Sequence, residues 1–214
     1  MGSERPESII AARGTRLSMR INLTDRQWAG FFLFSGIGQF AIFLTVAEAI
    51  DPTYSVSTNY ISDLGVSAAA PVFNTAIILV GLAVLTTSWF LFRTFHDRIL
   101  MILVALAGIG AVGVGVFTEY SPDGLHSLFS LITFLFSALA AIYGFRVIRP
   151  PLQYISVLLG IFSLAALGLY VSGTYLGLGP GGMERMIVWP VLVWGLAFGG
   201  YLLVESPSPP MSAK

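Results

Sequence analysis

The chain has 214 residues, of which 56% are hydrophobic and 10% are charged, and its mean hydropathy is +0.83. Soluble domains carry about 25% charged residues, so this composition excludes an ordinary water-soluble fold. The chain has no cysteine, which excludes disulfides, thiolate metal sites and cysteine nucleophiles. Its 11 Lys and Arg residues balance 11 Asp and Glu residues, and nothing in the pattern points to nucleic-acid binding.

The first 24 residues are polar and have no clear apolar period, so we expect a disordered cytoplasmic arm. No apolar run begins before Trp28, and a cleaved signal peptide is therefore not expected. Thr24 followed by Asp25 is typical of a helix N-cap and predicts that the first helix begins there. The proline-rich residues 205–214 cannot continue a helix and are expected to form a disordered cytoplasmic tail.

Six apolar segments lie between these two ends, and each is long enough to cross a hydrocarbon core of ~30 Å as a helix. They are residues 28–49, 72–92, 99–117, 125–145, 154–174 and 186–204. Their short connections leave no room for a second domain. Residues 25–204 are therefore predicted to form an all-α integral membrane protein, a single bundle of six transmembrane helices.

The positive charges sit in alternate gaps between the apolar segments. Ten of the 11 Lys and Arg residues fall in the N-terminal arm, the second gap, the fourth gap and the tail, and only Arg185 lies elsewhere. Cytoplasmic loops are enriched in Lys and Arg, which predicts a cell-membrane protein with both termini in the cytoplasm. On the outer side, Arg185 would then share its surroundings with six carboxylates: Glu48, Asp51, Asp63, Glu119, Asp123 and Glu184.

Small residues recur at helical spacing within two of the apolar segments. Ala107, Ala111 and Gly115 share one face of the third segment, and Gly195 and Gly199 share one face of the sixth. Such stripes allow close approach of helices in lipid. Packing within the bundle is favoured over a dimer seam.

The first outer loop, about residues 50–71, is the longest connection and has no cation. It contains enough apolar residues that we expect it to be partly ordered and to fold over the outer mouth of the bundle. Asn59 and Asp63 are four residues apart and would share a face of a helical turn, with Ser62 beside them. Asp63 could then serve as an acid, a base or a counter-ion. The equally weighted alternative is that Asn59, Ser62 and Asp63 cap the loop and the second helix.

The second outer segment runs from Glu119 to Ser127 and contains the strong turn sequence Ser-Pro-Asp-Gly. Asp123 is a good N-cap for the fourth helix. His126 falls in the first turn of that helix, whose dipole disfavours the imidazolium. A neutral His126 could be a general base or a metal ligand, although a structural hydrogen-bonding role is the more common one for a single His at a helix start.

The third outer segment has four glycines and Pro180 between Gly177 and Gly182, and we expect a loop that allows close backbone approach. Glu184 and Arg185 follow, and the sixth helix is expected after them. An Arg near the apolar zone normally has a partner. We predict that Arg185 pairs with Asp63, Glu119 or Asp123, and the alternative is that it binds a substrate phosphate or carboxylate.

These outer motifs are expected to converge. The outer ends of six neighbouring helices lie within a few helix diameters of one another, and polar groups near hydrocarbon are costly unless they satisfy one another or a ligand. We therefore predict one pocket at the outer mouth that joins Asn59, Asp63, His126 and Arg185.

At these motifs the chain resembles the DUF998 family, a group of integral membrane proteins of unknown function. The resemblance rests on Asn59-Tyr60-Ile61-Ser62-Asp63-Leu64-Gly65, on His126-Ser127 at the start of a span, and on Gly182-Met183-Glu184-Arg185 before the last span. It covers about residues 28–204. It implies a membrane fold and no particular activity.

Three functions remain open at this stage. The first is an outward-facing polar pocket that binds or transports a lipid headgroup or a small solute. The second is a membrane-embedded hydrolase acting on lipid at the outer leaflet, with Asp63 and His126 as candidate catalytic residues and with Asp63, Asp123 and His126 as candidate ligands of a divalent metal such as zinc or calcium. The third is a structural subunit of a membrane complex. The candidate binding residues are Asn59, Ser62, Asp63, Glu119, Asp123, His126, Glu184 and Arg185.

Overall fold

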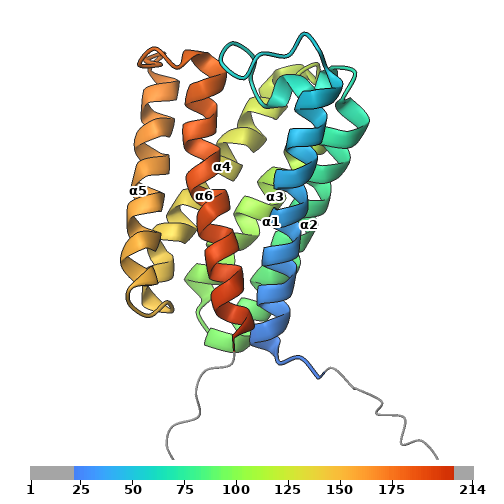
Figure 1. Ribbon diagram of the computed structural model, residues 1–214. Coiled ribbons are helices and arrows are strands. Elements are labelled where there is room, and N and C mark those ends of the chain that lie inside the picture. Colours follow the sequence, from blue (N-terminus) through green and yellow to red (C-terminus); the bar gives the residue numbers. More distant parts are fainter. Residues whose placement is uncertain (1–21, 205–214) are drawn as a thin grey trace, which may run out of the picture.

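The computed structural model describes residues 22–204, and the predictions made for the N-terminal arm up to residue 21 and for the C-terminal tail lie outside them. Six long helices make up most of this part of the chain (Figure 1). They are α1 (Asp25–Ile50), α2 (Ala70–Phe95), α3 (Arg98–Val116), α4 (Leu125–Tyr143), α5 (Leu152–Val171) and α6 (Gly179–Leu203). Three short 3-10 helices accompany them: η1 (Ser62–Val66), η2 (Pro122–Gly124) and η3 (Gly144–Arg146). All six long helices are long and apolar enough to cross a membrane, so the predicted all-α, multi-pass fold is confirmed.

The first helix begins where the sequence predicted, and the last helix begins earlier than predicted. Thr24 caps α1, and its hydroxyl accepts a hydrogen bond from the backbone N–H of Gln27, whose side chain in turn accepts from the Thr24 N–H. In contrast, α6 begins at Gly179, inside the segment that was predicted to be a glycine loop. Pro180 occupies the first turn, where its missing N–H costs nothing. The carbonyl of Ser57 accepts the N–H groups of Gly181 and Gly182, which would otherwise lack partners.

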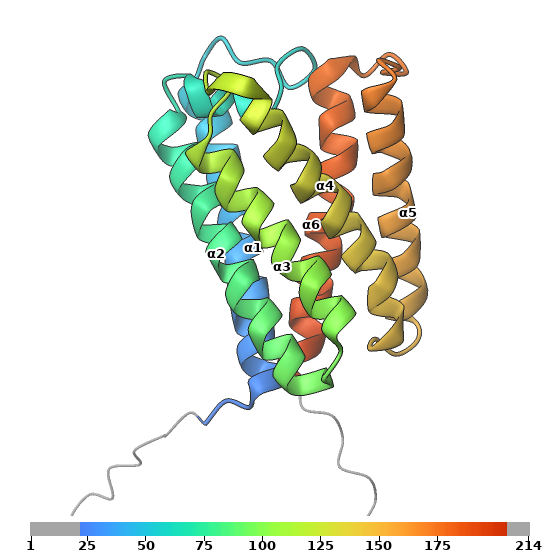
Figure 2. The same cartoon turned by 180° about the vertical axis from the view of Figure 1, so that it is seen from behind.

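The helices form a bundle around an interior cavity rather than a flat layer. Each helix packs on its neighbours in the chain, and α6 closes the arrangement against α1. The interior is lined by α1, α2, α3, α4 and α6, whereas α5 contributes nothing to it and packs against α4 and α6 from outside. The second view shows that α4 runs obliquely, close to α5 at one end of the bundle and away from it at the other (Figure 2).

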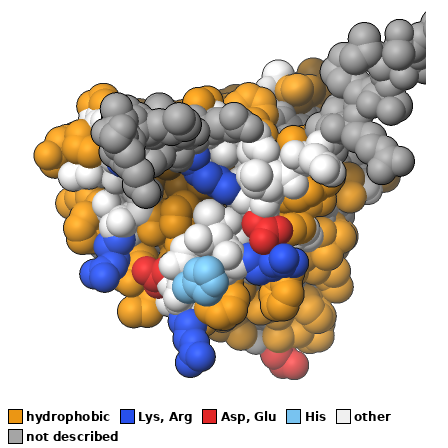
Figure 3. Space-filling view, turned by 90° about the horizontal axis from the view of Figure 1, so that it is seen from below, with side chains coloured by type: hydrophobic (Ala, Val, Ile, Leu, Met, Phe, Trp, Pro, Cys, Tyr) orange, Lys and Arg blue, Asp and Glu red, His pale blue; other side chains and the backbone are white. Residues whose placement is uncertain are grey.

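The two ends of the bundle differ in charge. We call the end where α1 begins and α6 finishes the terminal end, and the end that carries residues 51–69 the loop end. Arginines gather at the terminal end together with a few carboxylates (Figure 3). Arg93 pairs there with Asp25 at 3.0 Å, and Arg146 lies 3.9 Å from Asp97. Both described chain ends therefore lie at the arginine-rich end, as the alternation of charge along the sequence requires.

The stripes of small residues face other helices of the same chain. Ala107 and Ala111 are buried in the bundle. A Cβ added at Gly199 would lie 2.8 Å from the backbone nitrogen of Phe34, and one added at Gly115 would lie 2.7 Å from Ile77. The glycines of α3 and α6 thus permit close packing on α2 and α1, as the favoured interpretation predicted.

Candidate functional site

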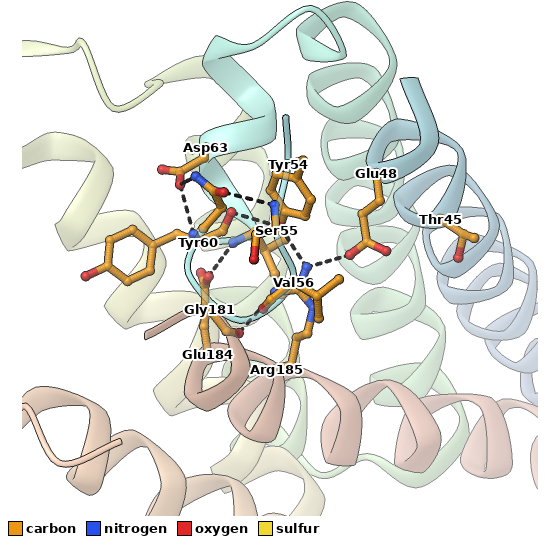
Figure 4. Close-up of polar contacts among 12 residues, drawn as sticks. Thr45, Glu48, Tyr54, Ser55, Val56, Tyr60, Asp63, Gly181, Glu184 and Arg185 are labelled. Carbon is orange, nitrogen blue, oxygen red and sulfur yellow. Dashed lines mark hydrogen bonds and ion pairs between the residues drawn. The ribbon is translucent and has the colours of Figure 1, made fainter. Parts of the chain in front are cut away.

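Arg185 is the centre of a closed cluster at the loop end, which we call the arginine clamp (Figure 4). Its side chain is buried, and one guanidinium nitrogen donates to Oε1 of Glu48 at 2.5 Å and to the hydroxyl of Tyr54 at 2.7 Å. The other terminal nitrogen donates to the carbonyls of Val56 and Gly181, both at 3.0 Å. The clamp therefore ties α1, the α1–α2 connection and α6 together, and it uses the donors that a ligand would need.

Tyr54 completes the clamp, because its hydroxyl both accepts and donates a hydrogen bond. Its hydroxyl accepts from Arg185 and donates to the carbonyl of Tyr60 at 2.9 Å. Burial raises the pKa of Tyr54 to about 12, even though the hydrogen bond from Arg185 opposes the shift. The phenol therefore keeps its proton at physiological pH and can continue to donate.

The partner of Arg185 is a correction to the sequence prediction. Asp63, Glu119 and Asp123 were expected, whereas Glu48 forms the ion pair. The reason lies in the packing, because Glu48 occupies the last turn of α1 and α1 packs directly beside α6. Hydropathy and spacing identify which residues share an end of the bundle, but they do not identify which helices are neighbours.

Asn59 and Asp63 organise the connection between α1 and α2. The Asn59 amide donates to Oδ2 of Asp63 at 2.9 Å and its oxygen accepts from the N–H of Ser55 at 3.0 Å. The same Asp63 oxygen accepts the N–H of Tyr60 at 2.9 Å, at the start of η1. Ile61 and Leu64 of this connection are buried in the core. The contacts of Asn59 are those of the capping role that the sequence left open.

Glu184 lies next to Arg185 in sequence and differs from it in its contacts. Its side chain is buried with 5% of the residue surface exposed, and Oε2 accepts the backbone N–H of Ile61 at 2.5 Å. Among the described residues, Glu184 forms no ion pair, and its Oε1 accepts no hydrogen bond. A carboxyl group in a buried position normally has more partners than this.

Glu119 and Ser62 connect the α3–α4 segment with η1. The Ser62 hydroxyl donates to Oε1 of Glu119 at 2.5 Å. Burial raises the pKa of Glu119 and the nearby charge of Asp63 raises it further, while the hydrogen bond from Ser62 acts in the opposite direction. Glu119 therefore takes up a proton at a higher pH than an exposed glutamate does.

His126 has a defined tautomer. Its Nδ1 lies 2.8 Å from the carbonyl oxygen of Phe117, which can only accept, so Nδ1 carries the proton in that contact. In the neutral ring Nε2 is then an acceptor, and the Ser130 hydroxyl lies 3.4 Å from it. The structural role expected for a single His is thus present, and Nε2 has the long contact with Ser130.

These groups surround a cavity of about 570 Å³ between the loop-end segments, α4 and α5, which we call the loop-end pocket. Its wall contains five of the predicted binding residues: Ser62, Asp63, Glu119, His126 and Glu184. The wall also contains four apolar residues of α4 and α5: Leu131, Phe134, Leu167 and Val171. The structure thus brings Asp63 and His126 into one pocket, although they are far apart in sequence.

Three predicted residues do not line the loop-end pocket: Asn59, Asp123 and Arg185. Asp123 is exposed and has a φ of 61°, and it does not cap α4, because Gly124 occupies the N-cap position. In residues 22–204, no group of three or more His, Asp and Glu side chains is placed to hold a metal ion. Of the three candidate metal ligands considered from the sequence, Asp63 and His126 line the loop-end pocket and Asp123 does not.

Sequence reasoning missed two aromatic residues of the pocket wall. Tyr60 and Tyr170 both line it, and their rings meet edge to face with centroids 5.9 Å apart. Tyr60 lies within the Asn-Tyr-Ile-Ser-Asp motif, so its neighbours could have identified it as a residue of the site. The sequence around Tyr170 could not, because a tyrosine near the end of an apolar span is ordinary at a membrane interface.

Comparison with known proteins gives a family but no activity. Residues 34–201 match the family model described as "Protein of unknown function (DUF998)". No curated protein and no solved structure matches the chain. The chemistry of the loop-end pocket must therefore be argued from its own residues.

Proposed function

The chain belongs to the DUF998 family, and we propose from its site geometry that it binds a membrane amphiphile whose headgroup carries an amine. The headgroup would occupy the loop-end pocket, and the apolar part of the molecule would contact the membrane-facing part of the same wall. The proposal selects the lipid-headgroup hypothesis from the alternatives that the sequence left open.

The observation that carries this proposal is the charge of the pocket wall. Asp63, Glu119 and Glu184 contribute carboxyl groups, His126 contributes an imidazole ring, and no Lys or Arg among the described residues lines the pocket. Ionisable groups near hydrocarbon need a partner of opposite charge or a hydrogen-bond donor. An ammonium group supplies both, whereas a phosphate would meet like charges.

A second feature favours an amphiphile over a free solute. Leu131 and Phe134 on α4 and Leu167 and Val171 on α5 adjoin the polar groups directly. A water-soluble amine would leave these side chains facing solvent. A lipid-like molecule would contact both the polar and the apolar residues of the wall. At this end of the bundle α4 lies away from α5, because it runs obliquely (Figure 2).

We infer that the loop end faces the outside of the cell membrane, because arginines mark the terminal end as cytoplasmic. A cysteine introduced at Tyr120, which is 82% exposed at the loop end, should react with an impermeant thiol reagent in intact cells. One introduced at His96, between α2 and α3, should not. The reverse pattern would place the pocket on the cytoplasmic side.

Native mass spectrometry of the purified protein tests the headgroup proposal. In a neutral detergent, dodecylamine should form a saturable adduct of one molecule per chain, and dodecanoate should not compete with it. Glu184→Gln keeps the shape of the side chain and removes the carboxyl group that could pair with an ammonium, so it should weaken the dodecylamine adduct at least tenfold. Equal binding of dodecanoate, or full binding by Glu184→Gln, would contradict the proposal.

A lipid hydrolase is the second candidate, and the tautomer of His126 favours it. Nδ1–H is held by the Phe117 carbonyl, which leaves Nε2 as an acceptor beside the Ser130 hydroxyl in a pocket with two further acids, Asp63 and Glu119. A ring nitrogen in this state can serve as a general base. Release of free fatty acid from a lipid amide or ester, lost in His126→Gln, would establish it. Unchanged lipid after prolonged incubation would leave binding as the function.

A further inference from the structure

We propose that the ligand has a single alkyl chain and that this chain lies inside the helical bundle rather than in the surrounding lipid. The inference rests on the proposed function, because it concerns the other half of the same molecule. Its basis is the apolar cavity enclosed by α1, α2, α3, α4 and α6, which we call the central cavity.

The central cavity extends along most of the bundle. Its wall includes Ile61 and Glu184 at the loop end, and Leu33, Leu91 and Phe198 toward the terminal end. Glu184 and Phe198 are 14 residues apart on α6, which corresponds to ~21 Å of helix. The cavity is thus long in the direction of the membrane normal, as a lipid chain is.

The central cavity and the loop-end pocket share part of their walls. Four residues line both of them: Ser62, Ser130, Phe134 and Glu184. Ser130 and Phe134 are one helical turn apart on α4, and Glu184 comes from α6. On this proposal, the chain of a ligand whose headgroup occupies the pocket passes these four side chains to enter the bundle.

The size of the central cavity selects one chain. Its volume is about 130 Å³ on a measure by which a single water molecule takes ~10–15 Å³, so it holds on the order of ten water-sized groups. Methylene groups are of similar size, and the cavity therefore accepts a single chain of about that length. A two-chain lipid would have to leave its second chain outside.

The wall of the central cavity is mostly apolar along its length. The polar side chains other than tryptophan are Ser62, Ser130, Thr133, Ser137 and Glu184, and four of them already form hydrogen bonds that their hydroxyls donate or share. Trp194 also lines the wall, and its indole N–H has no hydrogen-bond partner among the described residues. Apolar cavities do not take up ordered water and readily accept apolar molecules. Only Glu184 retains an unused oxygen, and it stands at the junction, where the charged end of a chain entering the cavity would lie.

Trp194 provides a built-in test, because it lines the central cavity ten residues after Glu184 on α6, or ~15 Å deeper. The other three tryptophans, Trp28, Trp89 and Trp189, are replaced by Phe so that Trp194 alone fluoresces. The protein is placed in lipid nanodiscs and titrated with 12-bromododecylamine, whose terminal bromine quenches a nearby indole. We expect saturable quenching over the concentration range in which dodecylamine forms its adduct.

Two variants on α3 give the matched comparison. Ala111→Phe places a ring in the central cavity and should abolish the quenching, whereas Ile109→Phe changes a 45% exposed, lipid-facing position and should leave it unchanged. Val191→Phe fills the cavity from α6 and replaces Ala111→Phe if that variant does not fold. A protein that retains only Trp189, which is 39% exposed, reports bromine in the surrounding lipid.

The outcomes separate this inference from the proposed function. Saturable quenching of Trp194 that Ala111→Phe removes supports a chain inside the bundle. An adduct in mass spectrometry without quenching of Trp194, or with quenching that survives both filling variants, would overturn the inference and leave the headgroup proposal intact. Absence of any adduct would overturn both.

Discussion

The two sides of the loop end differ in how many partners the protein supplies to an ionisable side chain. On the α1 side, Arg185 has a carboxylate, a phenol and two carbonyls as partners, all supplied by the protein. On the α4 side, Glu184 has a single backbone N–H, and its second oxygen finds no partner among the described residues. The two residues are adjacent on α6, so they share depth and helix but not neighbours.

This contrast separates structural polar groups from those that can recognise a ligand. A buried charge with a complete set of partners stabilises the packing of the elements that supply them, and its removal leaves the others uncompensated. A buried ionisable group with an incomplete set adds little to the folded state and can bind what supplies the missing partner. Arg185 is a buried charge with its partners in place, and Glu184 is an ionisable group of the second kind.

The largest expected effect is the loss of the clamp. Arg185→Ala leaves Glu48 without its partner in a position that is only 24% exposed, and it removes the donor from the carbonyls of Val56 and Gly181. We expect the free energy of unfolding to fall by about 3 kcal/mol, the lower end for buried pairs because Glu48 retains some solvent. Thermal unfolding in detergent measures this.

Arg93→Ala is the matched control for the clamp, since it removes the exposed pair with Asp25 at the terminal end. That pair is solvated, and its loss should cost less than ~1 kcal/mol. Equal effects of the two variants would mean that Arg185 is not structural, and the contrast drawn between the two sides of the loop end would then be wrong.

The next effect concerns the close approach on the clamp side. A Cβ added at Gly181 would lie 1.9 Å from the carbonyl oxygen of Asn59, which is backbone and cannot move aside alone. Gly181→Ala should therefore destabilise the protein by about 2 kcal/mol. Gly200→Ala on the same helix meets nothing within 4 Å and should be neutral or slightly stabilising. Melting of both variants under one condition decides the matter, and an unaffected Gly181→Ala would show that the α1–α2 connection can move away from α6.

The fold could be predicted from the sequence because a long apolar segment indicates a helix that is surrounded by lipid rather than by water. The six spans, the Thr24 cap and the packing role of the small residues follow from helix length, capping chemistry and close approach in lipid. The early start of α6 did not follow, because Ser57, which accepts the N–H groups of Gly181 and Gly182 in its first turn, is far away in sequence.

The site could be predicted only in part, for a related reason. The alternation of charge along the sequence predicted that Ser62, Asp63, Glu119, His126 and Glu184 lie at one end of the bundle. Five polar side chains at one end are expected to lie near one another. The roles of the two neighbours on α6 could not be assigned, because they depend on which helix faces each residue. Glu48 reaches Arg185 through the α1–α6 contact, and such a contact between the two ends of the chain has no local signal.

The smallest expected effect is the pH dependence of binding, which concerns the carboxyl and imidazole groups of the pocket: Asp63, Glu119, His126 and Glu184. Burial raises the pKa of Glu119 above its ordinary value of 4.5, so this carboxyl becomes protonated as pH falls through a range that lies above 4.5. An alkylamine stays cationic there, since amines of this kind titrate near pH 10. Binding of dodecylamine should therefore weaken as pH falls through that range.

Glu119→Gln isolates the share of this residue in the pH dependence. It removes a partly exposed charge from the pocket and should weaken binding about threefold at neutral pH, or ~0.7 kcal/mol, with a shallower decline of binding as the pH falls.

The same substitution should make the stability of the folded protein less sensitive to rising pH. A raised pKa means that the folded state gains from the protonated form at low pH and loses that gain as pH rises through the shifted value. Titration of the adduct and of the melting temperature over one pH series tests both statements. A pH profile identical to that of the unsubstituted protein would assign the titration to Asp63, His126 or Glu184 instead, and it would remove Glu119 from the group that distinguishes the pocket side from the clamp side.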